Sequence, residues 1–300
     1  MAIVRISQVH IHQVVIDQFG PIFAELIELL TDCLQRLGVE VSHAPNVTRE
    51  DRPNLIVGAT CFLAEPWLTA IARCPSPVIV FQSEILDEER GFLPRFQPYW
   101  RFLQGAQHIW DYSETNVRYL DAMGTRGASY VRLGYSPRMQ RIQPAATQDI
   151  DVLFYGAGSP RRARVVSEMR RLGLETVHAF NCFGAERDRL IARAKINLNV
   201  HQFERAPLEQ LRITYLLNNR CCVVSETSDT DSYGGGVVFA PLDELPARCA
   251  ELLAPGMESV RHEVAERGFA ALEAIPMLES VRAALARVEA GSTVRVAGDR

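Results

Sequence analysis

The sequence predicts an α/β protein with two domains, each built around a parallel sheet. Short apolar runs typical of buried strands alternate with segments whose apolar residues recur at helical spacing. Such alternation is typical of β-α-β units, which produce parallel sheets. A polar segment with two prolines, residues 136–149, interrupts the alternation near the middle of the chain, and the pattern restarts after it.

In the first half, strands are indicated by runs rich in Val, Ile and Phe, and helices by apolar residues every three to four positions. Pro21 suits the first turn of a helix, Gly38 suits a helix end, and Ser113 is a typical N-cap. Expected strands cover residues 3–15, 39–42, 54–58, 77–82, 108–112 and 130–133. Expected helices cover residues 21–37, 65–73, 93–103 and 114–123, the third interrupted by prolines.

The second half repeats the alternation and ends in helices. Expected strands cover residues 151–155, 176–179, 196–200, 221–226 and 237–240. Expected helices cover residues 160–172, 184–194, 208–217, 242–253, 257–272 and 277–289, and the last dozen residues are expected to fray. We therefore divide the chain into an N-terminal domain of residues 1–140, a C-terminal domain of residues 150–275 and a terminal segment of residues 276–300.

Composition argues for an ordinary globular protein and against several special classes. With 300 residues, 47% hydrophobic and 23% charged, the chain can bury a core in each domain. A net charge of −4 disfavours a dedicated nucleic-acid binder. The seven cysteines form no C-x-x-C pair and are expected to be reduced. Since no signal peptide or transmembrane segment is apparent, we expect a cytoplasmic location.

Residues 196–226 carry the densest group of ionisable side chains. Asn199, His201 and Glu204 follow one predicted strand, and Ser225 and Glu226 end the next. Ligands of open α/β sheets bind outside the carboxyl ends of the strands, so a ligand site is expected at this edge.

The helix between these strands adds a candidate anion-binding group. Glu209 and Arg212 are three residues apart and are expected on the same side of the helix. Burying such charges without a partner is costly, and a ligand-lined cleft removes that cost. The alternative is that Arg212 forms an ion pair with Glu209 within the helix.

The turn after the strand at residues 151–155 has the composition of a phosphate-binding loop. Gly156 and Gly158 allow the backbone to approach a ligand closely, and the following helix offers free N–H groups. Arg161 and Arg162 oppose the helix dipole unless an anion lies nearby. The alternative is an ordinary tight turn with solvated arginines.

These motifs resemble a known family. The pattern Asn199-x-His201-x-x-Glu204, then Leu208-Glu209, Arg212-Ile213 and Val223-Val224-Ser225-Glu226, resembles the nucleotide-binding half of bacterial GT-B glycosyltransferases, families 1 and 4. Residues 78–86 and 109–120 resemble the acceptor domain of the same enzymes. One departure is Tyr215, which stands where many relatives carry a ribose-binding glutamate.

The resemblance implies two Rossmann-like domains facing across a cleft, with the helix of the terminal segment 276–300 crossing back to the N-terminal domain. It also implies transfer of a sugar from a nucleotide diphosphate sugar, without a metal and with no cofactor beyond the donor. The acceptor stays open between a glycan, a natural product, a protein and a modified nucleic acid, as does the oligomeric state. The implied donor-binding residues are Gly156, Gly158, Arg161, Arg162, Asn199, Glu204, Glu209, Arg212, Ser225 and Glu226. The catalytic candidates are Glu84, Asp111 and His201.

Two other functions fit parts of the sequence. G-x-G-x-x-R at Gly156 is a partial dinucleotide fingerprint, so an NAD(P)-dependent oxidoreductase is one alternative, with Glu175 as its ribose-binding acid. A degenerate GT-B module that binds a nucleotide sugar or a partner is the other. Asp229 and Asp231 form a D-x-D in a glycine-rich loop, and His10 and His12 share one strand face, but neither pair indicates a metal site by itself.

Overall fold

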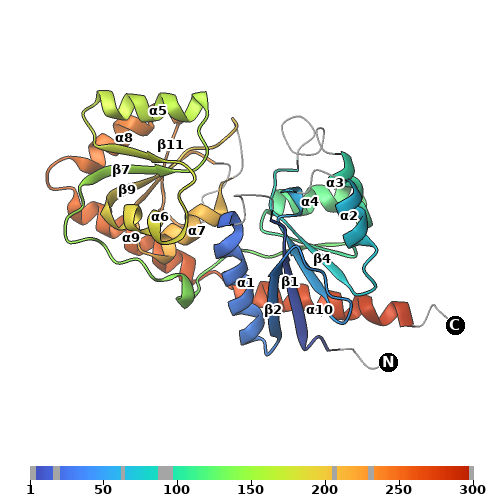
Figure 1. Ribbon diagram of the computed structural model, residues 1–300. Helices are drawn as coiled ribbons and strands as arrows, with labels where there is room; N and C mark the ends of the chain where they lie inside the picture. Colours follow the sequence, from blue (N-terminus) through green and yellow to red (C-terminus); the bar gives the residue numbers. More distant parts are fainter. Residues whose placement is uncertain are drawn as a thin grey trace. The chain divides into compact units, whose positions relative to one another are not determined.

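A computed structural model describes residues 5–15, 21–61, 65–86, 97–204, 208–228 and 233–296. The chain forms two compact units (Figure 1). The first unit comprises Met1–Leu133 and Pro276–Arg300, and the second comprises Gly134–Ile275. Each unit is a parallel sheet covered by helices on both faces, which confirms the predicted α/β class.

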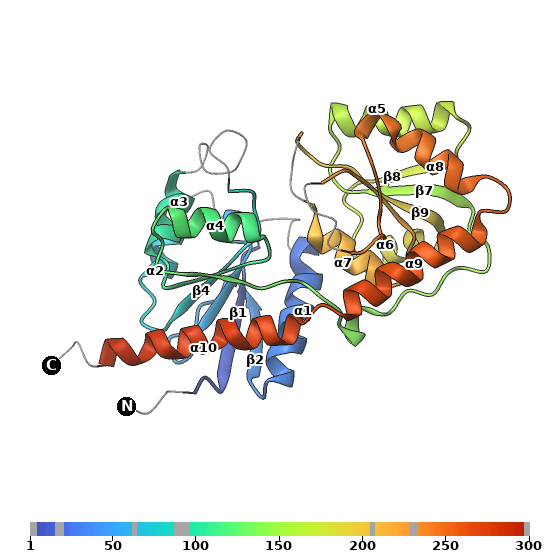
Figure 2. The same cartoon turned by 180° about the vertical axis from the view of Figure 1, so that it is seen from behind.

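The sheet of the first unit has the strand order β2-β1-β3-β4-β5-β6, and every neighbouring pair is parallel. Helices α2, α3 and α4 cover one face and share an apolar core with it, while α1 and α10 lie on the other face (Figure 2). The strands are β1 (Gln8–Gln13), β2 (Glu40–Pro45), β3 (Asn54–Val57), β4 (Val78–Gln82), β5 (His108–Asp111) and β6 (Ala128–Tyr130). The helices are α1 (Ala24–Arg36), α2 (Glu65–Ala72), α3 (Gln97–Gly105), α4 (Glu114–Ala122) and α10 (Met277–Val296).

The start of α4 and the end of α10 can be compared with their predicted positions. Ser113 is the N-cap of α4 as predicted, and its hydroxyl accepts a hydrogen bond from the backbone N–H of Asn116. The expected fraying of the last dozen residues is wrong for most of them, since α10 continues to Val296. Gly291 lets this helix approach β5 closely, because a Cβ there would stand 2.9 Å from a ring carbon of His108.

The sheet of the second unit has the order β11-β10-β9-β7-β8, again all parallel. Helices α5 and α8 pack on one face, and α6, α7 and α9 on the other (Figure 2). The strands are β7 (Ile150–Tyr155), β8 (Thr176–Ala179), β9 (Ala194–Asn199), β10 (Val223–Glu226) and β11 (Val238–Ala240). The helices are α5 (Pro160–Arg171), α6 (Gly184–Arg193), α7 (Gln210–Asn218), α8 (Leu245–Leu253) and α9 (Glu258–Glu273).

The connections of this second sheet change direction between β7 and β9. The chain moves from β7 outward to β8, and then crosses back over β7 to β9 and continues to β10. Helices α5 and α6 therefore lie on opposite faces, and the loops after β7 and β9 separate at the carboxyl edge. A reversal of this kind is where open α/β sheets bind their ligands.

The polar segment predicted to be a linker is held on the second unit. The side-chain oxygen of Asn218 accepts a hydrogen bond from the N–H of Ser136 at 3.1 Å. The side-chain oxygen of Asn219 accepts from the N–H groups of Arg141 and Ile142, both at 2.8 Å. Two buried asparagines at the end of α7 thus fix the path of residues 136–142.

The described thiols behave as small apolar side chains. Cys33, Cys222 and Cys249 are buried and free, and burial raises the pKa of Cys33 and of Cys222 to about 12. A thiol with so high a pKa is a poor nucleophile. No helix of the described residues combines the length and the apolar character that a membrane span requires.

Two buried histidines on β1 make the stability of the first unit sensitive to acid. His12 has 3% of its surface exposed, and burial, together with the nearby His10, lowers its pKa to about 4. Burial also lowers the pKa of His10, with the charges of Arg49, His43 and Arg52 acting in the same direction. Because the folded form resists protonation, the stability is fully present above about pH 6.5 and declines as the pH falls toward 4.

We expect His12 to account for a loss of about 2 to 3 kcal/mol in the free energy of unfolding between about pH 7 and pH 4. Urea unfolding of the wild type and of His12→Gln across this range measures it. The variant removes the titrating group, so its stability should depend less steeply on pH. Parallel curves for the two proteins would show that His12 does not contribute.

Candidate functional site

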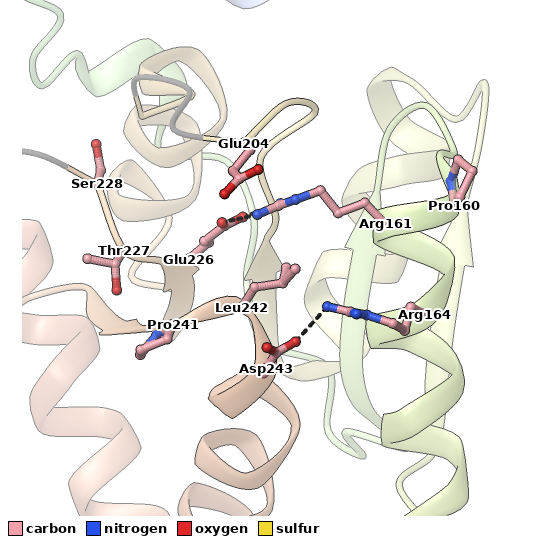
Figure 3. Close-up of a pocket in the computed structure, with 10 residues that line it drawn as sticks. All are labelled: Pro160, Arg161, Arg164, Glu204, Glu226, Thr227, Ser228, Pro241, Leu242 and Asp243. Atoms are coloured by element: carbon pink, nitrogen blue, oxygen red, sulfur yellow. Dashed lines mark hydrogen bonds and ion pairs between the residues drawn. The ribbon is translucent and has the colours of Figure 1, made fainter.

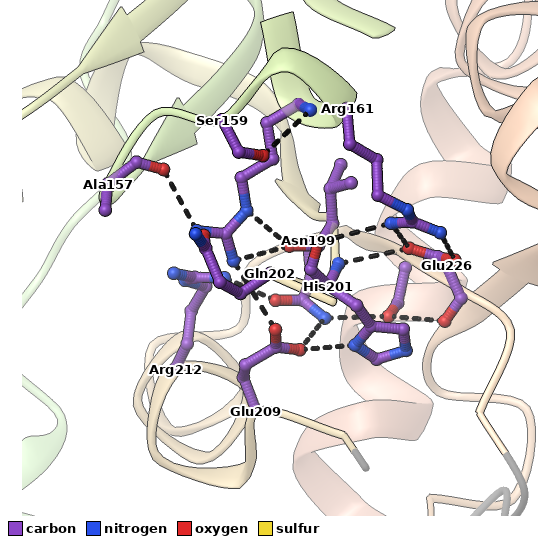
Figure 4. Close-up of polar contacts among 12 residues, drawn as sticks. Ala157, Ser159, Arg161, Asn199, His201, Gln202, Glu209, Arg212 and Glu226 are labelled. Atoms are coloured by element: carbon purple, nitrogen blue, oxygen red, sulfur yellow. Dashed lines mark hydrogen bonds and ion pairs between the residues drawn. The ribbon is translucent and has the colours of Figure 1, made fainter. Parts of the chain in front are cut away.

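The candidate site lies at the carboxyl edge of the second sheet, where its connections reverse. The glycine turn and the start of α5 follow β7, Asn199 ends β9 with Glu204 in the loop after it, and Glu226 ends β10. The structure brings these segments together with the start of α7 (Figure 4). The predicted donor-binding residues Gly156, Gly158, Arg161, Arg162, Asn199, Glu204, Glu209, Arg212, Ser225 and Glu226 all lie on these segments.

Arg212 lies against the glycine turn. Gly156 has a φ of 130°, and a Cβ built on it would stand 2.8 Å from Nη2 of Arg212. Nη1 of Arg212 donates a hydrogen bond to the side-chain oxygen of Asn199 at 2.5 Å. Within the described parts of the chain, Arg212 forms no ion pair, and its buried Nε has no hydrogen-bond partner. A cation whose hydrogen-bonding capacity is not fully used by the described residues therefore lies beside the turn.

The predicted alternative for Arg212, an ion pair with Glu209 inside the helix, does not form. Helix α7 begins at Gln210, and Glu209 precedes it with a non-helical backbone. The Glu209 carboxylate turns instead to Nδ1 of His201 and to the side-chain nitrogen of Asn199, each at 2.8 Å. Helical spacing therefore does not apply to this pair.

His201 and Glu209 form an ion pair in which the imidazole is buried and the carboxylate is partly exposed. Burial favours the neutral carboxyl of Glu209, but its hydrogen bond to His201 and the charge of Arg212 outweigh burial and lower its pKa to about 2. Burial likewise favours neutral His201, but the hydrogen bond and charge of Glu209, with Glu226, raise its pKa above the usual value. Both groups therefore carry their charge in mildly acidic solution.

Arg162 supports the turn from behind. It is 4% exposed, and its Nε and Nη2 donate to the carbonyl of Val200 at 2.9 and 2.7 Å. Its Nη1 donates to the carbonyl of Ala157 at 2.9 Å and to the side-chain oxygen of Gln202 at 2.5 Å. Burial and the charge of Arg212 lower its pKa to about 10. Arg162 thus adds positive charge and fixes two loops, while its donors are directed at protein oxygens.

Arg161 and Glu226 form a paired set that the sequence did not indicate. Nη1 of Arg161 donates to Oε2 of Glu226 at 2.5 Å, and Nη2 donates to Oε1 (Figure 4). The N–H of His201 donates to the same carboxylate at 3.1 Å. These residues are 65 positions apart, so only the fold reveals the contact. Ser225 accepts from the side-chain nitrogen of Asn199 at 3.0 Å.

A cavity of about 750 Å³, lined by both charged and apolar residues, opens beside this pair (Figure 3). It lies between the start of α5 and the segments that follow β10 and β11. Arg164 and Asp243 form an exposed ion pair across it, and neither residue was predicted. The lining residues are Pro160, Arg161, Arg164, Glu204, Glu226, Thr227, Ser228, Pro241, Leu242 and Asp243.

The two catalytic candidates of the first unit lie at the carboxyl ends of β4 and β5. Asp111 has no exposed surface, and it accepts hydrogen bonds from the N–H of Ser113 and from the side-chain nitrogens of Gln82 and Asn116. Burial raises its pKa to about 7 against these hydrogen bonds. A carboxylate so enclosed suits a positioning role.

Glu84 is partly exposed, unlike Asp111. Its backbone is fixed by Gln82, which receives a hydrogen bond from the N–H of Glu84 and donates one to its carbonyl. Burial raises the pKa of its carboxyl, and a hydrogen bond from Thr60 opposes that effect. Of the two residues, Glu84 is the one with exposed surface.

Among the described residues, which include His10 and His12, no group of three potential metal ligands occurs. Both ring nitrogens of His10 are engaged, by the hydroxyl of Ser42 and by the carbonyl of Val47. Asp229 and Asp231 lie outside the described residues.

Gly156→Ala should disturb the turn, because the new Cβ meets Arg212 and the backbone conformation at this position is unfavourable for alanine. We expect unfolding to become easier by about 1 to 3 kcal/mol. Chemical denaturation measures this. Gly158→Ala is the matched control: its Cβ would stand 3.5 Å from a ring carbon of His178, an ordinary contact, so its stability should stay near that of wild type. Equal effects at both positions would contradict the geometry of the turn.

Comparisons with known proteins identify the fold. No protein-family model matches the sequence. An uncharacterized protein, R358, of Acanthamoeba polyphaga mimivirus is 31% identical over 111 residues, which are 34% of this chain and 39% of that protein's length. That match therefore leaves well over half of both proteins unaligned.

Several solved structures are similar over nearly the whole chain. OtsA in its apo form has a TM-score of 0.60 at 8% identity and covers 95% of this chain and 99% of its own. An alpha-glucosyltransferase in complex with UDP and a 13-mer DNA has a TM-score of 0.59 at 10% identity, covering 88% and 94%. Sucrose-phosphate synthase from Thermosynechococcus elongatus has a TM-score of 0.52 at 11% identity, covering 96% and 98%. These structures confirm the predicted GT-B fold, and at such identities the likeness concerns the fold alone.

Proposed function

We propose that this chain is a glycosyltransferase that binds a nucleotide diphosphate sugar in its second unit and stabilises the leaving diphosphate with arginines. The position of Arg212 carries the proposal. A guanidinium without a carboxylate partner lies against a glycine turn at the carboxyl edge of the sheet, with its Nε unused within the described chain. Planar guanidinium groups pair well with phosphate oxygens, and glycine allows a phosphate to approach the backbone.

The charges around the turn suit a departing diphosphate. In the reaction, the bond between the anomeric carbon and a diphosphate oxygen breaks, and an acceptor oxygen bonds to that carbon. Negative charge grows on the diphosphate, and fixed cations stabilise it without having to reorganise. Arg212 would contact the diphosphate, while the buried Arg162 adds a second positive charge beside the turn. This supports a reaction that needs no metal.

Arg161 would also stabilise the diphosphate if a phosphate of the donor replaces Glu226 as its hydrogen-bond partner. Glu226 would then be free to accept hydrogen bonds from sugar hydroxyls, together with Glu204 of the same cavity. For a reaction that inverts the anomeric centre, a base must take the acceptor proton. Glu84 is our candidate, since a raised pKa makes its carboxylate a stronger base.

The geometry disfavours an NAD(P)-dependent oxidoreductase. A ribose-binding acid is expected at the carboxyl end of the second strand of the motif. Glu175 precedes β8 and pairs through its backbone with Asp151, so it lies at the amino edge of the sheet. The degenerate binding module uses the same site, and it differs from the proposed enzyme only in lacking turnover.

Thermal denaturation with UDP, GDP, dTDP, CDP, NAD or NADP, each with and without Mn²⁺, tests the proposal. A ligand that binds only the folded state raises the melting temperature. We expect one nucleoside diphosphate to stabilise the protein equally with and without Mn²⁺. Stabilisation by NAD or NADP alone would favour the oxidoreductase, and a strict need for Mn²⁺ would contradict the role given to the arginines.

A further inference from the structure

A continuous column of alternating arginines and aromatic rings runs through the second unit and ends at the candidate site. Each guanidinium carbon lies within 6 Å of the centroid of the next ring, the range of a cation–π interaction. The column is formed, in order, by Arg141, Tyr215, Arg187, Tyr155, Arg212, Phe154 and Arg162.

The far end of the column is fixed by hydrogen bonds. Arg187 is 5% exposed and donates to the carboxylate of Asp188, the nearer atom pair being 2.9 Å apart. The hydroxyl of Tyr215 donates to the same carboxylate at 2.8 Å and accepts from Nε of Arg141 at 3.0 Å. Tyr215, at the place where relatives carry a glutamate, is therefore part of the column.

At the candidate site, the column ends in Arg212 and Arg162, and Arg212 is held by fewer hydrogen bonds than Arg162. Arg212 and Arg162 are like charges close to the same ring, that of Phe154, at 5.6 and 5.2 Å. Arg162 is held by several carbonyl oxygens, whereas Arg212 has one side-chain oxygen, that of Asn199. The ring of Tyr155, 5.3 Å from Arg212 and 5.7 Å from Arg187, joins Arg212 to the fixed end.

We propose that Tyr155 and Arg187 are positioning residues that hold the Arg212 guanidinium against the glycine turn in the orientation that receives a diphosphate. The inference rests on the proposed function, because it presumes that Arg212 binds an anion. Neither residue contacts the diphosphate itself, so both act only through Arg212. A ring supports a guanidinium plane in a way that an aliphatic side chain does not.

The test is calorimetric titration with inorganic pyrophosphate, which probes the anion site whatever nucleobase the donor carries. Tyr155→Leu should weaken pyrophosphate binding by about tenfold. Tyr155→Phe keeps the ring and should bind pyrophosphate as the wild type does. Arg187→Lys keeps the charge beside Asp188 but loses the planar stack, and it should weaken binding several-fold. Circular dichroism confirms that each variant is folded at the temperature used.

The decisive comparison is the double variant of Tyr155→Leu with Arg212→Ala. If Tyr155 acts through Arg212, the double variant should bind pyrophosphate no more weakly than Arg212→Ala alone. Phe269→Leu is the control, since it removes a cation–π contact with Arg220 that lies outside the column, and it should leave binding unchanged.

The other outcomes would overturn either the positioning role alone or the positioning role together with the role of Arg212. Wild-type affinity in Tyr155→Leu, or additive losses in the double variant, would overturn the positioning role while leaving the proposed function intact. Equal losses in Tyr155→Leu and Phe269→Leu would show a general effect on folding and would also overturn it. Wild-type affinity in Arg212→Ala, or no pyrophosphate binding by the wild type, would overturn the role of Arg212 in the proposed function and the positioning role with it.

Discussion

Arg212→Ala is expected to weaken the binding of a nucleoside diphosphate by about 10- to 100-fold, the range typical for loss of a charge-assisted hydrogen bond. The affinity for the corresponding free nucleoside should not change. Arg212 has no ion-pair partner within the described residues and lies against Gly156, the proposed phosphate turn, so its removal should affect the phosphates of the ligand and not its nucleoside. Calorimetric titration with each ligand measures the two affinities.

Arg220→Ala is the matched control for this change. Arg220 is in the same unit, but it pairs with Glu266 and stacks on Phe269 outside the site. Its removal should leave both affinities unchanged. Arg212→Lys should fall between wild type and Arg212→Ala, because lysine keeps the charge but loses the planar pair of donors. Equal losses for nucleoside and nucleoside diphosphate would contradict a phosphate-binding role.

Glu209→Gln is expected to destabilise the second unit by about 2 to 3 kcal/mol, because it leaves the buried His201 without its anionic partner. The low pKa of Glu209 contributes stability that is present above its unfolded value of about 4.5 and is lost toward pH 2. The raised pKa of His201 contributes stability that is present below about 6.5 and is lost above its folded pKa. The cost should therefore be largest between about pH 5 and 6.5, and urea unfolding at several pH values measures it.

The same variant should lower the pKa of His201, since Glu209 is what raises it against burial. Titration of the histidine ring signals by NMR measures that shift directly. Glu204→Gln makes the same chemical change at an exposed carboxylate and should alter the stability by less than about 0.5 kcal/mol. An unchanged His201 pKa in Glu209→Gln would show that the two side chains are not paired.

The sequence predicted most of the elements because their periodicity is strong. The buried strands β7 and β10 and the amphipathic helix α1 begin and end within a few residues of the predicted bounds. The predicted bounds of an element were wrong where a contact distant in the sequence extends it beyond its apolar periodicity. The end of α10 is one case, since the contact of Gly291 with β5 is invisible to periodicity.

The candidate site was predictable as a location but not as a set of contacts. Strand ends and a glycine turn indicate an edge of the sheet, and the predicted residues lie there. The hydrogen-bond partners of these residues were not predictable. Arg161 and Glu226, for example, lie 65 positions apart and meet only in the folded chain. The alternative that paired Glu209 with Arg212 fails, since α7 begins at Gln210, two residues later than expected, and leaves Glu209 outside the helix. The cation–π contacts of Tyr155 with Arg187 and Arg212 depend on how β7, α6 and α7 pack, and no pattern in the sequence indicates them.

The most direct test of the account is release of a nucleoside diphosphate from nucleotide sugars. The protein, at a concentration equal to that of the donors, is incubated with a mixture of UDP-, GDP-, dTDP- and CDP-sugars in the presence of EDTA, and the products are measured by mass spectrometry. We predict that slow transfer of the sugar to water releases one nucleoside diphosphate with the wild type and does not release it with Arg212→Ala. Intact donors after prolonged incubation, together with no binding of any of them, would contradict the proposal that this chain is a glycosyltransferase.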